Sequence, residues 1–413
     1  MRIGCLLNLG YVALLLTLLT PLRARANWTL DAALERADEA SPNVRTAQQR
    51  VAIAEAHRTF ASVPVVGNPV LGVRAMVGVP DERAATYAVF LGLPFDWSGR
   101  QGLRAQEADA LIETSEAELQ ATRNDVRLQV TRAFIDTAVA GDLRAIAEQR
   151  LAVAQQLSER TTSMAQAGAA TRLDVALVEV ELGEAAAALA NAERNEFDAK
   201  DALRALLDLP TSDAMEVTMP SLDQASGDVA AWTEEALRSR AEPRSFAASA
   251  RRFRLSESRL FAESVDPLLV GLEWEAQGNN DTAQTLGVSL GTTLPLLNTA
   301  QGERAVALEE SALMSVSEGI AQRGVEREVF RASRQLDRAR AELAALESQA
   351  LPAMERAQSA MSELLTQGDV EFFRLVSVQR QLFETRAQRV NAMRVAFQAL
   401  ADVQHAIGTL GAP

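Results

Sequence analysis

The longest stretch without a helix-breaking residue most constrains the fold of this chain. No proline occurs between Pro94 and Pro210, and residues 101–165 read as one helix. Such a helix would be about 95 Å long at about 1.5 Å per residue, which no compact domain can contain. Aromatic residues make up only 5% of the 413 residues, which is typical of long helices rather than of a thick mixed core. The sequence therefore predicts a helical bundle or tube.

Heptad spacing indicates how these helices pack. One run in the second half of the chain follows strict 4,3 spacing, and a run in the first half begins the same register. These positions are Val325, Val329, Ala332, Leu336, Ala339, Leu343 and Leu346, and Val126, Val130, Ala133 and Thr137. Such spacing is typical of a coiled-coil seam. Pro352 falls late in the second run and predicts a kink or a break there.

The chain carries an internal duplication with a period of about two hundred residues. Proline and glycine landmarks recur in the same order, from Pro42 and Pro243 to Gly168 and Gly368. We expect repeats at 27–220 and 221–413. Each repeat should contain a helix of about thirty residues, two strands and a long helical hairpin with its tip near the glycine. The expected helices and strands are 31–61, 68–95, 229–264 and 266–295.

The first 26 residues have the pattern of a secretory signal peptide. A basic Arg2 precedes the apolar run from Leu6 to Leu19, and Ala24-Arg25-Ala26 offers a cleavage site before Asn27. The apolar run is shorter than the roughly 20 residues that a spanning helix needs, although retention as an anchor stays the alternative. Cys5 is the only cysteine, so the mature chain has no disulfide. The sequence therefore predicts an exported protein.

The four strands have one apolar face and one small, polar or charged face. The residues of the apolar face, expected to face lipid, include Leu71, Val73, Tyr87, Val89, Leu272, Trp274, Val288 and Leu290. The residues expected to face a wet lumen include Arg74, Glu273 and Glu275. Strands of about ten residues with this alternation are typical of a membrane β-barrel. A soluble two-layer sheet is the alternative.

A membrane location would require several chains to pool their strands. Four strands cannot close a barrel, and open sheet edges are not tolerated in lipid. Three copies would supply twelve strands, and their long helices would continue the barrel as a tube. The expected fold class is therefore α+β and mostly α, with a coiled-coil α-helical barrel and a transmembrane β-barrel of four strands per protomer in a homotrimer.

Charge and composition exclude several classes of function. Loss of Arg2, Arg23 and Arg25 with the signal peptide takes the formal net charge from −14 to −17, which argues against nucleic acid as a partner. His57 and His405 are the only histidines, and we expect both on helix surfaces. We expect no catalytic residue, no metal site and no cofactor, and the sequence has no phosphate-binding loop.

The duplicated layout and the hairpin motifs resemble the TolC family of outer-membrane efflux proteins. The segments that show the resemblance are LPFDWSGR and LPLLNTAQGE after the strands, and AGAATRLDVALVEVEL and QGDVEFFRLVSVQRQL at the hairpin tips. The family pattern G-x-x-[ST]-x-x-D-[VL] matches Gly168, Thr171, Asp174 and Val175. The resemblance implies a homotrimer in the outer membrane, with its helices in the periplasm and in contact with a periplasmic adaptor and an inner-membrane transporter. It also implies that Gly168, Thr171 and Gly368 form the tip turns that dock the adaptor.

The second tip departs from the family pattern. Family members often carry an acidic residue where this chain has Arg374, and a tyrosine where it has Leu365. We therefore expect Asp174 and Arg374 to control the tip aperture, as an ion pair that holds it closed. An exposed pair of this kind would contribute only about 0.2 to 1 kcal/mol.

The leading function is a passive exit duct of a tripartite efflux pump or a type I secretion system. A periplasmic adaptor is one alternative, although an adaptor normally has a single helical hairpin flanked by small β domains. A coiled-coil scaffold without a pore is the other, and it would leave the two faces of the strands without a purpose. Detergent dependence of extraction separates the duct from both.

Overall fold

The computed structural model describes residues 26–63, 67–77, 85–212, 214–220, 228–278, 283–367 and 372–410. The expected signal peptide, apart from Ala26, and the expected second tip glycine, Gly368, lie outside these residues. The chain forms two compact units. Of the described residues, the unit here called the sheet unit contains those within 38–128, 228–338 and 399–410, and the hairpin unit contains those within 26–37, 129–220 and 339–398.

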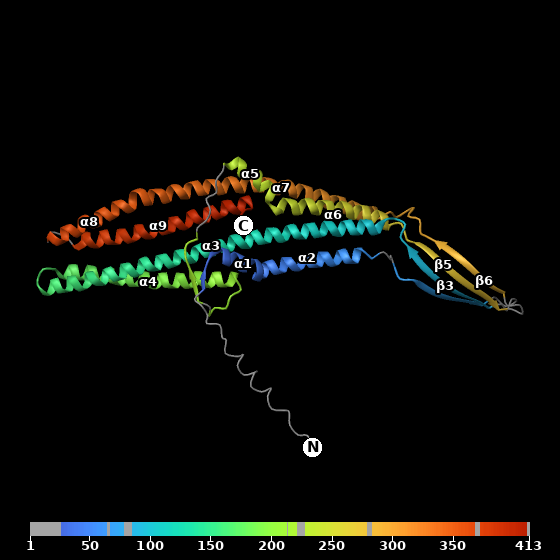
Figure 1. Ribbon diagram of the computed structural model, residues 1–413, viewed down its shortest axis with the longest axis horizontal. Coiled ribbons are helices and arrows are strands. Elements are labelled where there is room, and N and C mark those ends of the chain that lie inside the picture. Colours follow the sequence, from blue (N-terminus) through green and yellow to red (C-terminus); the bar gives the residue numbers. More distant parts are fainter. Residues whose placement is uncertain are drawn as a thin grey trace, which may run out of the picture. The chain divides into compact units, whose positions relative to one another are not determined.

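Four helical segments lie side by side in the sheet unit (Figure 1). They are α2 (Pro42–Ala61), the first part of α3 (Arg100–Gln166), α6 (Ala241–Glu263) and most of α7 (Gln301–Ala345). Ion pairs join successive neighbours: α2 and α3 through Arg58–Asp109, α3 and α6 through Arg259–Glu107, and α6 and α7 through Arg304–Glu257. Helices α2 and α7 therefore form the two edges of this layer.

The prediction of a single thirty-residue helix at the start of each repeat is wrong. The first is two helices, α1 (Leu30–Ala40) and α2, and the second is α5 (Val229–Ser239) and α6. Extended backbone at Ser41 and at Arg240 ends one helix and starts the next. Pro42 and Pro243 lie in the first turn of the following helix, where the missing N–H costs nothing.

A four-stranded antiparallel sheet completes the sheet unit. Its order is β2-β3-β5-β6, with bounds Val70–Val77, Ala85–Phe95, Leu268–Gly278 and Ala283–Gly291. These strands lie within the predicted ranges. A second, two-stranded parallel pair was not predicted, and it joins β1 (Ala26–Trp28) to β4 (Met215–Val217) in the hairpin unit.

The hairpin unit is built from α3, α4 (Arg172–Leu206), α8 (Leu351–Gln367) and α9 (Phe372–Ile407). Helix α3 runs unbroken over Arg100–Gln166, which confirms the predicted helix over 101–165. Ile135 and Val139 of α3 pack against Val390 of α9. Nearer the turn between α3 and α4, Leu157 and Val178 pack against Leu375. Helix α3 therefore lies between α4 and α9.

The predicted coiled-coil seam is confirmed at most of its positions, whereas Leu343, Leu346 and Ala133 are only half-buried. Val325, Val329, Ala332, Leu336 and Ala339 are each no more than 4% exposed. The corresponding seam of α3 is also buried at Val126, Val130 and Thr137. Alanine and valine at these positions let neighbouring backbones approach closely, which is why a chain with few aromatic residues still packs.

The helix does not break at Pro352. A π-helical turn, η1 (Leu346–Ala350), joins α7 directly to α8. The Leu351 amide donates to the Leu346 carbonyl, a bond that spans one residue more than in an α-helix, so the backbone widens before the proline ring. None of the helices in the described ranges has the length and apolarity to span a bilayer.

Candidate functional site

The outer face of the sheet is a continuous exposed apolar surface. The register aligns Leu71, Leu91, Leu272 and Val288 in one row across all four strands. Val73, Val89, Trp274 and Leu286 form the next row. The eight residues predicted to face lipid are between 37% and 76% exposed. A face of this kind requires an apolar partner.

The opposite face carries the residues predicted to line a lumen. Arg74 on β2 reaches over β3 to Glu273 on β5, with 4.0 Å between Nη1 and Oε1. Glu275 lies in the same cross-strand row as Arg74. The ring of Phe90 lies over Gly92 and Gly271, where a β-carbon would overlap it. The small residues on this face therefore make room for one aromatic ring.

The turn between α3 and α4 contains the first three predicted tip residues. Gly168 has φ +75°, and the Ala169 amide donates to the Met164 carbonyl at 2.8 Å, which closes the end of α3. Glycine adopts this left-handed conformation without strain. Thr171 is the N-cap of α4, and its hydroxyl accepts from the Asp174 amide at 3.2 Å. Gly168 therefore ends one helix, and Thr171 begins the next.

Asp174 completes a reciprocal capping box. Its Oδ2 accepts from the Thr171 amide at 2.8 Å and from the Thr171 hydroxyl at 2.6 Å. These hydrogen bonds hold the pKa of the Asp174 carboxyl below its usual value. The spacing Thr171-x-x-Asp174 is a capping signature that the sequence analysis did not use. Asp174 thus has a structural role at the tip, and its control of an aperture stays a prediction.

The second tip is described up to Gln367 and again from Phe372. Arg374 lies in the first turn of α9 and is exposed. The corresponding positions of this tip are Gly368, Glu371 and Arg374, so the capping pair of Thr171 and Asp174 is not repeated in sequence. The two tips are therefore chemically different, as predicted. Pairing of Asp174 with Arg374 stays a prediction.

Removing the carboxylate of Asp174 should loosen the start of α4. In Asp174→Ala, the Thr171 amide and hydroxyl lose their acceptor, so we expect faster amide hydrogen exchange over residues 171–175. Asp174→Asn keeps an acceptor oxygen and should exchange at a rate between those of the alanine variant and the wild type. Unchanged exchange in both variants would show that the capping box contributes nothing to the order of the tip.

A buried polar cluster lies where α9 ends in the sheet unit. His405 is only 6% exposed, so the prediction that it lies on a helix surface is wrong. His57 is exposed, as predicted. The Nε2 of His405 lies 3.2 Å from Asp125 Oδ1, and its Nδ1 lies 3.3 Å from Glu328 Oε1. Arg240 completes the cluster and contacts Glu328 at 3.2 Å. Helix periodicity could not have revealed this cluster, because its members come from four separate segments.

The cluster keeps His405 charged. Burial disfavours the imidazolium and Arg240 repels it, but hydrogen bonds to Asp125 and Glu328 outweigh both and raise the pKa of His405 to about 9. The C-terminal end of a helix also favours a cation. The hydrogen bond from His405 in turn lowers the pKa of Glu328 against the effect of burial.

The charged histidine makes stability depend on pH. Because folding raises this pKa from 6.5 to about 9, the stabilisation is complete below pH 6.5 and is lost as the pH rises through 9. At about 1.4 kcal/mol per pKa unit it is on the order of 3 kcal/mol. We expect the free energy of unfolding to fall over this range in the wild type and to fall much less in His405→Gln. Denaturant titrations at pH 6.5 and 9.5 measure the difference, and parallel curves for the two proteins would contradict it.

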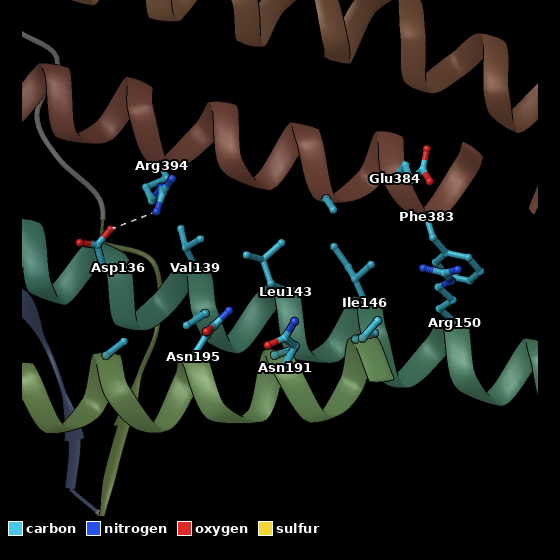
Figure 2. A pocket seen from close by; sticks show the side chains of 16 residues that line it. Asp136, Val139, Leu143, Ile146, Arg150, Asn191, Asn195, Phe383, Glu384 and Arg394 are labelled. Carbon is cyan, nitrogen blue, oxygen red and sulfur yellow. Dashed lines mark ion pairs between the residues drawn. The ribbon is translucent and has the colours of Figure 1, made fainter. Parts of the chain in front are cut away.

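A cavity of about 460 Å³ opens between α3, α4 and α9 in the hairpin unit (Figure 2). Val139, Leu143 and Ile146 of α3 form its apolar wall. At one end Asp136 accepts from Gln398 at 2.8 Å and lies 3.8 Å from Arg394. Burial raises the pKa of Asp136 despite these two partners. Over the described residues, no three His, Cys, Asp or Glu side chains gather as they would around a metal ion.

Comparisons with known proteins agree with this architecture. The chain is 25% identical over 404 residues to the cobalt-zinc-cadmium resistance protein CzcC of Cupriavidus metallidurans, covering 94% of this chain and 92% of CzcC. The structure is similar to the outer-membrane channel OprN, with a TM-score of 0.74 and 19% identity over 92% of this chain and 90% of OprN. It is also similar to the outer membrane protein VceC of Vibrio cholerae, with a TM-score of 0.72 and 18% identity over 92% and 96% of the two chains. No protein-family model matches the chain.

The fold is that of the outer-membrane channels. The resemblance to the TolC family that the tip and strand motifs implied is confirmed by these comparisons. OprN is an outer-membrane channel and VceC an outer membrane protein, and the outer-membrane location predicted for this chain agrees with theirs.

Proposed function

We propose that this protein is the exit duct of a tripartite efflux pump or a type I secretion system. The observation that carries the proposal is the exposed apolar face of the sheet, which has two unbroken apolar rows across four strands and charged residues on the opposite face. Lipid would cover the first face and water the second. Outer-membrane lipid, a periplasmic adaptor and an inner-membrane transporter are the partners this role requires.

The sheet edges support a homotrimer. Within the described sheet, β2 and β6 each pair with one neighbour only. An open edge is not tolerated in lipid, so β6 of one copy would pair with β2 of the next. Three copies would close a barrel of twelve strands.

The helical layer of the sheet unit has matching unpaired edges. On α2, exposed residues recur with strict 3,4 spacing at Thr46, Gln49, Ile53, Ala56 and Phe60. On α7, Val306, Leu313, Val316 and Ile320 form an exposed apolar stripe with similar spacing. Each stripe has the pattern of one side of a coiled-coil seam. We infer that α7 of one copy packs against α2 of the next.

The tips would control the opening of the duct. Asp174 and Arg374 are the residues we propose for the aperture, and Gly168, Thr171 and Gly368 for adaptor docking. A double charge swap, Asp174→Arg with Arg374→Asp, tests the pair, because it should restore closure that either single change loosens. Closure unaffected by the single changes would show that this pair does not hold the tip.

The cargo can be narrowed to a first candidate. CzcC is a cobalt-zinc-cadmium resistance protein, and the chain covers 92% of its length. Divalent metal cations are therefore the first cargo to test, by resistance of a host that lacks its own duct. Selectivity need not lie in this chain, because a passive duct passes what its transporter delivers.

Single-channel conductance in a planar bilayer tests the proposed function directly, with the mass measured in the same detergent. We expect a trimer with small, flickering openings that widen in Arg374→Ala. A protein that stays soluble without detergent and never inserts would exclude the duct and favour the adaptor or the scaffold.

A further inference from the structure

A row of four arginines follows one face of α7 in the sheet unit. Arg327, Arg331, Arg334 and Arg338 recur at intervals of four, three and four residues, which places them on one stripe of the helix. All four are exposed. Arg334 lies over the ring of Phe330, 5.5 Å from its centroid. Among the residues that the structure describes, no carboxylate forms an ion pair with any of the four.

This arginine row continues the apolar edge of the same helix. Val306, Leu313 and Ile320 are spaced by seven residues, and two further steps of seven reach Arg327 and Arg334. Residues seven apart lie on nearly the same line of an α-helix. Whatever covers the apolar stripe therefore extends over the arginine row.

An acidic row lies on the segment that precedes the opposite edge. Asp31, Glu35 and Glu39 recur every four residues on α1, are exposed, and form no ion pair with the described residues. The buried side of α1 consists of Ala33, Leu34, Ala37 and Ala40. Helix α1 leads directly into α2, so the acidic row lies next to the edge that would receive α7 of another copy.

Contacts inside the sheet unit place Glu39 of the acidic row and Arg327 of the arginine row at the same level along the helices. Asp38 on α1 pairs with Arg127 on α3 at 2.7 Å. Two residues earlier on α3, Asp125 contacts His405, which contacts Glu328 on α7. Glu39 and Arg327, the neighbours of Asp38 and Glu328, are therefore at matching positions on the two sides.

We infer that the arginine row of α7 in one copy binds the acidic row of α1 in a second copy of this chain. The inference rests on the proposed trimer and adds the charged half of its interface. The apolar stripes supply contact area, and the opposite charges favour the approach of α7 to α1 and disfavour any other like-charged surface at that place. Among the described residues of a single copy, neither row has an ion-pair partner.

Site-specific crosslinking tests this contact in the full chain. Cys5, the only native cysteine, precedes the predicted cleavage site, so introduced cysteines will be the only reactive ones in the exported protein. Arg327→Cys with Glu39→Cys should give covalent trimers with a short bis-maleimide, which adds one thiol at each end, since the Cα atoms of an arginine–glutamate pair lie beyond the roughly 7 Å that a direct disulfide spans. The control pair, Arg327→Cys with Glu234→Cys on α5, should give none.

Charge reversal supplies the second measurement. Arg331→Glu together with Arg334→Glu should reduce the trimeric fraction in detergent by more than half, and adding Glu35→Arg and Glu39→Arg should restore it. Arg340→Glu, which reverses an exposed charge on the opposite side of the same helix, should leave the trimer unchanged. Restoration by the compensating charges separates a specific contact from a folding defect.

The outcomes distinguish this inference from the proposed function. A trimer with the Arg327–Glu39 crosslink supports both. A trimer that lacks the crosslink and stays trimeric after the charge reversals overturns the inference. The arginine row would then bind some other acidic partner, and the proposed duct function would be unaffected. A chain that is not trimeric in detergent overturns both.

Discussion

Arg240→Ala is expected to lower the free energy of unfolding by about 3 kcal/mol. The Arg240 side chain is 7% exposed and contacts Glu242 at 2.6 Å and Glu328 at 3.2 Å. It also donates to the His405 carbonyl at 3.2 Å, at the end of α9. Its loss would leave the half-buried carboxylate of Glu242 and the carbonyls at the end of α9 without this donor. The charged His405 still contacts Glu328 in this variant. The expected loss of stability is therefore near the lower end of the range for the loss of one partner of a buried ion pair.

Arg238→Ala is the matched control for Arg240→Ala. Arg238 lies two residues before Arg240 and pairs with Glu234, but these two side chains are 65% and 71% exposed. Solvent screens such a pair, so its loss should cost less than about 1 kcal/mol. Urea titration in detergent measures both variants. Equal losses would mean that burial of Arg240 does not strengthen its contacts.

Gly271→Ala should disrupt the sheet far more than its size suggests. A β-carbon at Gly271 would overlap the ring of Phe90 and the hydroxyl of Ser289. Phe90 would have to leave its place over the glycines, at a cost of about 1 to 3 kcal/mol for overpacking. We expect a lower thermal midpoint and a smaller yield of assembled protein.

Two variants make this expectation specific. Gly291→Ala, at the end of β6, meets no atom within 4 Å and should behave as the wild type. Phe90→Ala combined with Gly271→Ala should recover much of the loss, because the ring that clashes is gone. Failure of that rescue would place the cost of Gly271→Ala in the backbone or in the overlap with Ser289 rather than in the contact with Phe90.

Several features followed from residue pattern alone. The helix over residues 101–165, the seam through Val325 and Val329, and the four strands all depend on local periodicity, which backbone geometry translates directly into structure. The same pattern identified the apolar and polar faces of the sheet, because a strand turns alternate residues to opposite sides. It also placed the first tip at Gly168, where a positive φ is required.

Other features were decided only by the tertiary structure. Each initial helix splits in two because extended backbone at Ser41 and Arg240 turns the chain, which a helical pattern on both sides conceals. A π-helical turn, rather than a break, accommodates Pro352. His405 is buried because α3, α7 and α9 bring Asp125 and Glu328 to its two ring nitrogens. The spacing of apolar residues predicts which side of a helix or strand is buried. Only the packing of segments that are distant in the sequence decides which charged side chains contact one another there.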